Sequence, residues 1–290
     1  MRFHLLCFGF GYSAQALARR LGPEWHITGT GRGEPDISTL AARHVRLMRF
    51  DRDHPLDQSV FAGVTHILLS VPPDERGDPV FDRHGNDIAA IPGLAWLGYL
   101  STTGVYGDRN GGWVDETSEL RPTGERGRRR AAAEAAGLGL WHQRGVPVHI
   151  FRLAGIYGPG RSPIDALRAG TARRIDKPGQ VFSRIHVDDL VGVLLASIAR
   201  PRPGAVYNVC DDEPASPVDV VAHAAALLGL PAPLLVPFEA AGLSPMAGSF
   251  YADNKRVSNA LIKTELAVRL RYPSYREGLR AILADESAGP

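Results

Sequence analysis

Short apolar runs alternate with helix-forming stretches from the start of the chain, and this alternation constrains the fold more than any other feature. The runs that predict strands cover residues 3–8, 26–30, 45–50, 66–71, 96–101, 148–153 and 205–210, and helices are predicted at 13–21 and 188–199. Strands separated by helices at this spacing favour a parallel sheet joined by right-handed crossovers. The sequence therefore predicts an α/β fold with a doubly wound parallel sheet, the Rossmann fold, and a smaller C-terminal lobe.

Proline-rich interruptions mark the loops of the second half, at residues 201–203, 214–217 and 231–237. From Pro214 onward the pattern indicates helices and loops outside the main sheet. We therefore expect residues 1–160 and 184–212 to form the sheet domain, and residues 161–183 and 213–290 to form the smaller, substrate-binding lobe.

The composition excludes several classes of protein. Of 290 residues, 44% are hydrophobic and 22% are charged, as in globular proteins, and no apolar stretch is long enough to cross a membrane. The first residues meet Gly9 too soon for a secretory signal, so a cytoplasmic location is expected. Cys7 and Cys210 stand alone in apolar runs, which suggests core packing and neither a disulfide nor a metal site.

The formal charge of +2 gives no general attraction to nucleic acid, although four arginines gather at Arg126, Arg128, Arg129 and Arg130. A solvated helix face accounts for such a cluster. We therefore expect no nucleic-acid partner and no membrane partner.

A glycine-rich turn follows the first predicted strand directly. Residues 9–14 read Gly-Phe-Gly-Tyr-Ser-Ala, the G-x-G-x-x-A form of the dinucleotide fingerprint. In this pattern Gly9 forms the tight turn, Gly11 lets the backbone approach a pyrophosphate, and Ala14 allows close packing of helix on strand. The amides at the start of the next helix then point at the phosphates. The cofactor-binding set is predicted to comprise Gly9, Phe10, Gly11, Tyr12, Ser13 and Ala14.

The end of the second strand favours NADP(H) over the alternative, NAD(H). An NAD site carries an acidic residue there, whereas this chain reads Thr28-Gly29-Thr30-Gly31-Arg32. Arg32 is placed to pair with a 2′-phosphate, and Thr30 offers a hydroxyl. An ordinary exposed arginine is the alternative reading of Arg32.

Two further strand ends are candidates for cofactor contact. Asp51 could accept a hydrogen bond from an adenine amino group, and an equally plausible role is to cap its own loop. Ser70, Val71 and Pro72 follow the fourth strand at the edge where a dinucleotide crosses the sheet.

Several longer segments carry a family resemblance. Residues 99–108 read Tyr-Leu-Ser-Thr-Thr-Gly-Val-Tyr-Gly-Asp, and residues 151–161 read Phe-Arg-Leu-Ala-Gly-Ile-Tyr-Gly-Pro-Gly-Arg. Arg-Ile-His-Val-Asp-Asp-Leu follows at 184–190 and Tyr-Asn-Val at 207–209. In this order they resemble the motifs of extended short-chain dehydrogenase/reductases, the NAD-dependent epimerase/dehydratase family. The tail, at residues 254–259 and 272–278, is similar to a small divergent branch called atypical.

The resemblance implies a catalytic hydroxyl, a Tyr and a Lys, the last two in a Tyr-x-x-x-Lys helix. Thr102 matches the hydroxyl that orients a substrate carbonyl. With the helix placed by Glu134, Arg126 stands where Tyr is expected and Arg130 where Lys is expected. Arginine stays protonated at any working pH, so Arg126 cannot relay a proton. Arg130 could still hold the ribose hydroxyls of a cofactor.

The proton source is therefore open, with Tyr106, Tyr157, His186, Tyr251 and water as alternatives, each side chain having an ordinary structural role as its other reading. The resemblance also implies cofactor contacts for Leu153 and Ala154, and substrate contacts for Arg161, Tyr157 and His186, with a surface cation as the alternative for Arg161. Thr103 and Gly104 follow Thr102 where the dehydratases of the family carry acids, so dehydration is disfavoured.

Two functions follow from these patterns. The first is an NADP(H)-dependent oxidoreductase or epimerase for a small carbonyl or sugar-like substrate. The second is a cofactor-binding module that has lost its chemistry and serves as a sensor or regulator. A homodimer is an expectation from the family alone.

Overall fold

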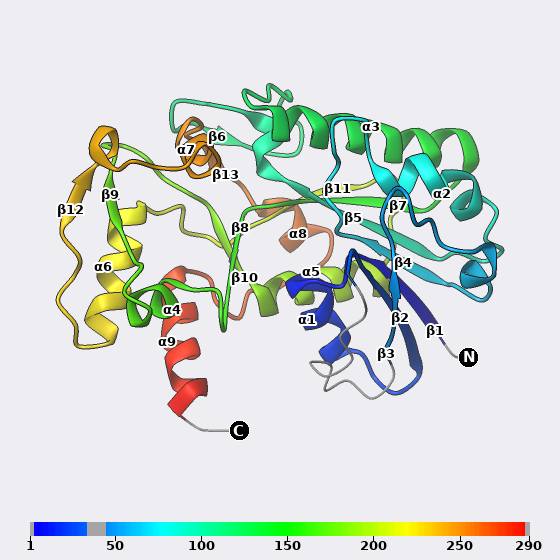
Figure 1. Cartoon of the computed structure of the whole chain (residues 1–290), viewed down its shortest axis with the longest axis horizontal. Helices are drawn as coiled ribbons and strands as arrows, with labels where there is room; N and C mark the ends of the chain where they lie inside the picture. The colour runs from blue at the N-terminus through cyan, green and yellow to red at the C-terminus, as the bar shows by residue number, and fades with distance from the viewer. Residues whose placement is uncertain (1–2, 34–44, 288–290) are drawn as a thin grey trace. The chain divides into compact units, whose positions relative to one another are not determined.

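The computed structural model describes residues 3–33 and 45–287. A seven-stranded sheet has the order β11-β7-β5-β4-β1-β2-β3 (Figure 1). Its strands are β1 (Phe3–Phe8), β2 (Trp25–Gly31), β3 (Val45–Arg49), β4 (His66–Leu69), β5 (Trp96–Thr102), β7 (Val148–Leu153) and β11 (Val206–Val209). Each predicted strand is present, with its ends moved by no more than a few residues. The doubly wound α/β fold is thus confirmed.

The order of the strands reverses between β1 and β4. Strands β1, β2 and β3 follow one another outward on one side of this point, and β4 and β5 follow on the other. The pairs β1–β2, β2–β3, β1–β4 and β4–β5 are all parallel. Ligands of open parallel sheets bind beyond the carboxyl ends of the strands at such a reversal. The turn after β1 therefore lies at the position where this fold binds ligands.

Helices cover both faces of the sheet (Figure 1). The helices that belong to it are α1 (Tyr12–Arg20), α2 (Pro79–Ala89), α3 (Glu125–Arg144) and α5 (Val187–Ala199). Alternate residues of the strands, among them Leu6, Phe8 and Leu69, pack in one core cluster with Val80 of α2 and Ala133 of α3. Leu5 and Cys7, which alternate with Leu6 and Phe8 along β1, are fully buried as well. Burial on both faces explains why the strands are continuous apolar runs in the sequence.

The chain divides into two compact units. Unit 1 comprises Met1–Thr102, Glu125–Arg152 and Val193–Tyr207, and unit 2 comprises Thr103–Gly124, Leu153–Gly192 and Asn208–Pro290. Unit 2 contains helices α4 (Pro163–Arg168), α6 (Pro217–Leu227), α7 (Pro245–Tyr251), α8 (Ala260–Thr264) and α9 (Tyr275–Ser287). Its core joins Ile164 of α4, Val220 of α6 and Leu279 of α9.

Unit 2 also contains three two-stranded sheets, which pair β8 (Gly155–Tyr157) with β10 (Arg184–His186), β9 (Arg174–Asp176) with β12 (Leu235–Pro237), and β6 (Trp113–Val114) with β13 (Arg256–Val257). The stretch after Pro214 lies outside the main sheet, as expected, but it is not free of strands. Segments of two or three residues are too short to show the alternation by which strands are recognised. In the described part of the chain, no helix has the length and apolar character required to span a membrane.

Candidate functional site

The turn after β1 is built around a glycine that its neighbours require. Gly9 has φ +87°, and a Cβ atom there would lie 2.6 Å from Oγ of Ser70. The amide of Gly9 donates to Oγ1 of Thr30 at 3.0 Å, and its carbonyl accepts from Oγ of Ser70 at 2.7 Å. The ends of β2 and β4 therefore hold the turn from both sides, and a side chain at this position would displace them.

Gly11 differs because nothing among the described residues requires a glycine there. Its backbone is extended, with φ −89° and ψ −160°, and a Cβ atom would meet no atom of residues 3–33 and 45–287 within 4 Å. Gly11 is also the N-cap of α1, which has no side-chain cap and no acidic residue in its first turn. The helix thus presents its first amides beside open space, an arrangement suited to a diphosphate.

The other residues of the fingerprint support this turn. Ala14 is fully buried and Ser13 nearly so, which brings α1 close to the sheet. The ring of Phe10 covers Gly29 of β2, where a Cβ atom would lie 2.5 Å from the ring. Tyr12 is half-buried at the first position of α1. The fingerprint residues therefore fit a nicotinamide dinucleotide: amides and small residues lie where its phosphates would bind.

The residues proposed for the adenosine end lie at the carboxyl ends of β2 and β3 or just beyond them. Arg32 is exposed after β2, whereas Thr30 is buried and its hydroxyl accepts the Gly9 amide. Asp51 caps its own loop, with Oδ1 accepting from the amides of Asp53 and His54 at 2.9 and 3.0 Å. The hydrogen bond from the His54 ring lowers the pKa of Asp51. Thr30 and Asp51 thus shape the loops that surround this end.

The segment after β4 lies against the glycine turn. A Cβ atom on Gly9 would meet Cγ2 of Val71 at 3.3 Å as well as the Ser70 hydroxyl. Pro72, the next residue, is exposed. Ser70 and Val71 therefore form a wall of the turn, and Pro72 faces solvent beside it.

The arginine cluster lies on α3, which packs against β5. Arg128 and Arg129 pair with Glu125 one turn earlier, at 3.1 and 3.0 Å. Arg126 is exposed. Thr102 is half-buried at the carboxyl end of β5. A surface helix face therefore accounts for most of the cluster, but Arg130 behaves differently.

Arg130 turns inward toward β5. Its Nη1 donates to the carbonyl of Leu100 at 2.6 Å and to the hydroxyl of Tyr99 at 3.2 Å. Burial raises the pKa of Asp78, which is 4% exposed, against lowering contributions that include the Arg130 charge and the Tyr99 hydroxyl. Asp78, Tyr99 and Arg130 form a polar group inside unit 1 that fixes the guanidinium at the end of β5.

Glu134, one turn further along α3, forms a buried ion pair. Its carboxylate accepts from Nη2 of Arg152 on β7 at 2.8 Å and from Nε at 3.1 Å, and the Ser101 hydroxyl also donates to it. The side chains of Arg152 and Glu134 are 6% and 2% exposed. This pair connects α3 to two strands of the sheet.

Unit 2 contains the side chains considered as proton donors, and all four are buried. Tyr106 donates to Oδ1 of Asn208 at 2.7 Å, and Tyr157 donates to the carbonyl of Ser274 at 3.3 Å. Nδ1 of His186 accepts the Asp188 amide at 3.2 Å at the start of α5, and Tyr251 packs edge to face on Phe182. Each of the four therefore has a structural role.

Burial also shifts the pKa values of these donors. It raises the pKa of Tyr157 and of Tyr251, and it lowers the pKa of His186. At neutral pH the two phenols therefore stay protonated and the imidazole stays neutral.

The remaining candidates lie at turns or strand ends of unit 2. Arg161 is exposed and closes a tight turn with Gly158, in which each amide donates to the other residue's carbonyl. Leu153 and Ala154 are 8% exposed, and the Ala154 amide donates to the Val209 carbonyl at 3.1 Å.

Asp211 is a buried acid that the sequence pattern did not reveal. It is 1% exposed, and neither carboxyl oxygen has a hydrogen-bond partner among residues 3–33 and 45–287. Burial raises its pKa to about 8, although the Arg184 charge lowers it. The Arg184 guanidinium itself donates to the carbonyls of Phe182 and Ala215.

The raised pKa of Asp211 predicts a stability that falls as the pH rises. The folded protein holds this proton more tightly than the unfolded chain, so the stabilisation is complete below the ordinary pKa of 3.8 and is lost progressively toward pH 8. We expect Asp211→Asn to raise the urea midpoint at pH 8–9 and to lose that advantage near pH 4. The exposed control Asp219→Asn should show no such pH-dependent gain, and a gain for Asp211→Asn that is independent of pH would contradict the assignment.

Comparison with known proteins relates part of the chain to a family. Residues 89–210 match the NAD dependent epimerase/dehydratase family. Protein YeeZ of Escherichia coli strain K12 is 28% identical over 238 residues, which cover 78% of this chain and 84% of YeeZ. A functionally unknown conserved protein from Silicibacter pomeroyi has a similar structure, with a TM-score of 0.89, 53% identity, and coverage of 98% and 99% of the two chains.

A more distant structure has the same fold. The dTDP-glucose 4,6-dehydratase of Bacillus anthracis in complex with NAD superposes with a TM-score of 0.76 at 17% identity, over 99% of this chain and 97% of the dehydratase. These matches agree with the glycine turn, the strand order and the motifs of residues 99–108 and 184–190. Residues 89–210 of this chain therefore carry the sequence pattern of the NAD-dependent epimerase/dehydratase family.

Proposed function

We propose that this chain is an NADP(H)-dependent oxidoreductase or epimerase that acts on a small carbonyl or sugar-like substrate. The observation that carries the proposal is Gly11, whose missing side chain leaves open space beside the uncapped start of α1. No packing or backbone constraint within the described residues explains a glycine there, whereas close approach of a pyrophosphate does. The sugar-like substrate is supported by relatives such as the human dTDP-D-glucose 4,6-dehydratase, 31% identical over 119 residues that form 34% of its length.

The preference for NADP(H) rests on the end of β2. Thr30 is followed directly by Gly31, Arg32 and Gly33. The exposed cation of Arg32 therefore stands where NAD sites carry an acidic residue. The hydroxyl of Thr30 is engaged by the Gly9 amide, which leaves Arg32 as the partner for a 2′-phosphate.

Removal of Arg32 provides a test of cofactor choice. Arg32→Ala should weaken NADPH binding about tenfold to a hundredfold, the equivalent of about 1.4–2.7 kcal/mol, and should leave NADH binding unchanged, because only NADPH carries the 2′-phosphate. Titration of both nucleotides, monitored by nicotinamide fluorescence, measures this difference. Arg200→Ala, which removes an exposed arginine just after α5, is the matched control. Wild-type preference for NADH, or an unchanged NADPH affinity in the variant, would refute the assignment.

Catalysis is assigned to Thr102 and Arg130. The bound cofactor supplies or accepts a hydride. The Thr102 hydroxyl, at the carboxyl end of β5, orients the substrate carbonyl by donating a hydrogen bond. Arg130, fixed by Leu100 and Tyr99, stands in place of the usual lysine and would donate to the ribose hydroxyls of a bound cofactor. Because the four candidate donors are buried and Arg126 stays charged, we assign the proton to solvent. Substrate binding is assigned to unit 2.

A second function is favoured by the two arginines that replace the Tyr-x-x-x-Lys pair. Without a titratable tyrosine, the chain would bind NADP(H) as a sensor or regulatory module and would not turn over. Both functions require the same glycine turn, so cofactor binding alone does not separate them.

Turnover separates the two functions. We expect NADPH oxidation with some member of a panel of aldehydes, ketones and nucleotide sugars, followed by its absorbance. Thr102→Ala should lower kcat by about 10²–10⁴-fold, the range typical of a positioned acid–base group, and should leave the Kd for NADPH unchanged. Tight NADPH binding without turnover on any member of the panel would favour the sensor. A Thr102→Ala variant that is as active as wild type would contradict the role of Thr102.

A further inference from the structure

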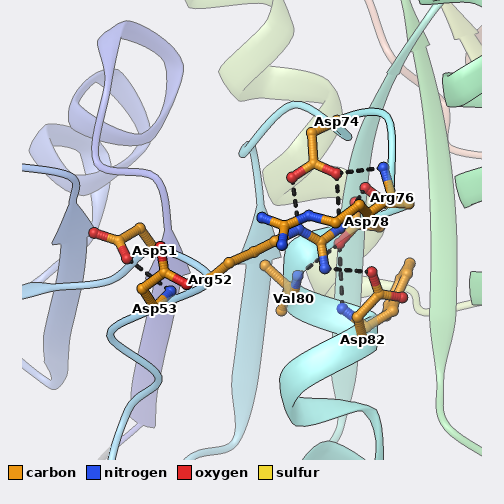
Figure 2. A network of polar contacts seen from close by, with 10 residues as sticks. Asp51, Arg52, Asp53, Asp74, Arg76, Asp78, Val80 and Asp82 are labelled. Atoms are coloured by element: carbon orange, nitrogen blue, oxygen red, sulfur yellow. Dashed lines mark hydrogen bonds and ion pairs between the residues drawn. The ribbon is translucent and has the colours of Figure 1, made fainter.

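Arg52, on the loop after β3, pairs with two carboxylates and one backbone carbonyl (Figure 2). Its Nε and Nη2 donate to the two oxygens of Asp74 at 2.5 and 2.9 Å, and Nη1 lies 2.7 Å from Oδ2 of Asp82. Nη2 also donates to the carbonyl of Gly77 at 3.0 Å. We call Arg52 with Asp74, Gly77 and Asp82 the Arg52 clamp.

The contacts of the Arg52 clamp hold the Arg52 side chain in one position. The side chain of Arg52 is only 10% exposed, and its planar fork matches the Asp74 carboxylate in a two-bond arrangement that lysine cannot reproduce. The Asp74 and Asp82 contacts raise the pKa of Arg52, and the Arg52 hydrogen bond lowers the pKa of Asp74. Arg52 and Asp74 therefore stay charged together over the physiological pH range.

The clamp joins loops whose strands are not neighbours. In the sheet, β1 and β2 lie between β3 and β4, yet Arg52 follows β3 whereas Asp74 and Gly77 follow β4. Because these strands are parallel, both loops leave the same edge of the sheet, beyond the carboxyl ends of β1 and β2. The clamp therefore connects the two loops on either side of the glycine turn.

The same β4 segment also contacts the glycine turn. Ser70 donates to the carbonyl of Gly9, and Val71 lies beside it. From Ser70 to Gly77 the segment is thus held at one end by the glycine turn and at the other by Arg52. In this fold the adenosine half of a dinucleotide lies on the β2 side of the turn, and the nicotinamide half lies on the other.

We propose that Arg52 is a positioning residue for the adenosine half of the cofactor, acting through the segment Ser70–Gly77. The inference rests on the proposed function, since it assumes that a dinucleotide binds at the glycine turn. Arg52 does not itself contact the nucleotide. It sets the separation of the β3 and β4 loops and so the width of the space that the adenosine enters.

Binding of half-cofactors provides the test. We expect Arg52→Gln to raise the Kd for NADPH and for ADP about tenfold, a change of about 1.4 kcal/mol, and to leave the Kd for reduced nicotinamide mononucleotide within twofold, all by isothermal titration. Asp82→Asn keeps the Asp74 fork and should produce a smaller loss with the same selectivity for ADP. Arg83→Gln removes the same charge from an exposed position on α2 and should change neither Kd.

Two results would overturn the inference: an unchanged Kd for ADP in Arg52→Gln, or equal losses for ADP and the mononucleotide, which would indicate general damage to the fold. If Arg52→Gln does not fold, Asp82→Asn decides by the same criterion. A wild-type protein that binds neither NADPH nor NADH would instead refute the proposed function, and this result is visible before any variant is made.

Discussion

Replacing Glu134 with alanine should lower the free energy of unfolding by about 3–5 kcal/mol, the usual cost of removing one partner from a buried ion pair. The side chains of Glu134 and Arg152 are 2% and 6% exposed, so loss of the carboxylate leaves the Arg152 charge buried without its counter-charge. The same change removes the acceptor of the Ser101 hydroxyl. One substitution therefore weakens the contact of α3 with β5 and with β7.

Urea denaturation of the ligand-free protein measures this effect. Glu134→Gln should lie between wild type and alanine, because the amide accepts a hydrogen bond but does not balance the Arg152 charge. Glu125→Ala is the matched control, since Glu125 is 58% exposed on the same helix, and its urea midpoint should not change. Equal midpoints for Glu134→Ala and wild type would show that the pair does not stabilise the sheet.

The sequence predicted the parts of this molecule that depend on local pattern. The strand from Phe3 to Phe8, the turn at Gly9 and the helix from Tyr12 involve residues within one short stretch, and their spacing alone predicts the geometry. Burial on both faces made the other central strands recognisable as apolar runs. The short strands β6 and β13 escaped recognition, because their two residues pair only through tertiary contact.

The direction of side chains was harder to predict. Arg130 could be placed on a helix and matched to a family position, but its hydrogen bond to Tyr99 joins residues 31 apart in sequence. The signal for Asp78 was present, since an Asp before Pro79 is a typical helix start, and its side chain does cap α2. Its proximity to Tyr99 and Arg130 depends on how α2 and α3 pack.

The Arg52 clamp and Asp211 were missed for a related reason. Arg52 lies in a charged run, Asp51-Arg52-Asp53, that resembles any solvated loop, and only the structure shows it to be 10% exposed. Asp211 is followed by Asp212 and Glu213, so the sequence alone suggests an exposed acidic turn. Burial of a charge depends on which segments cover it, and that information is distributed over the whole chain.

Replacing Gly11 with alanine should separate cofactor binding from stability. Alanine is compatible with φ −89° and ψ −160°, and its Cβ would meet no atom within 4 Å in the part of the chain that the structure describes. We therefore expect the free energy of unfolding of the ligand-free protein, measured in urea, to stay within about 0.5 kcal/mol of wild type, as for surface substitutions generally. The added methyl group would occupy space needed by the pyrophosphate. The Kd for NADPH should rise about a hundredfold, equivalent to about 2.7 kcal/mol.

Gly9→Ala is the contrasting variant, because it should lower stability as well as affinity. Its backbone has φ +87°, a conformation that costs an alanine about 1–2 kcal/mol, and its Cβ would meet Ser70 Oγ at 2.6 Å. Two glycines of one motif, separated only by Phe10, are thus expected to respond differently: substitution of Gly9 lowers both stability and affinity, whereas substitution of Gly11 lowers affinity alone. If Gly11→Ala binds NADPH as tightly as wild type, no phosphate lies near this turn, and the dinucleotide must be sought elsewhere on the chain.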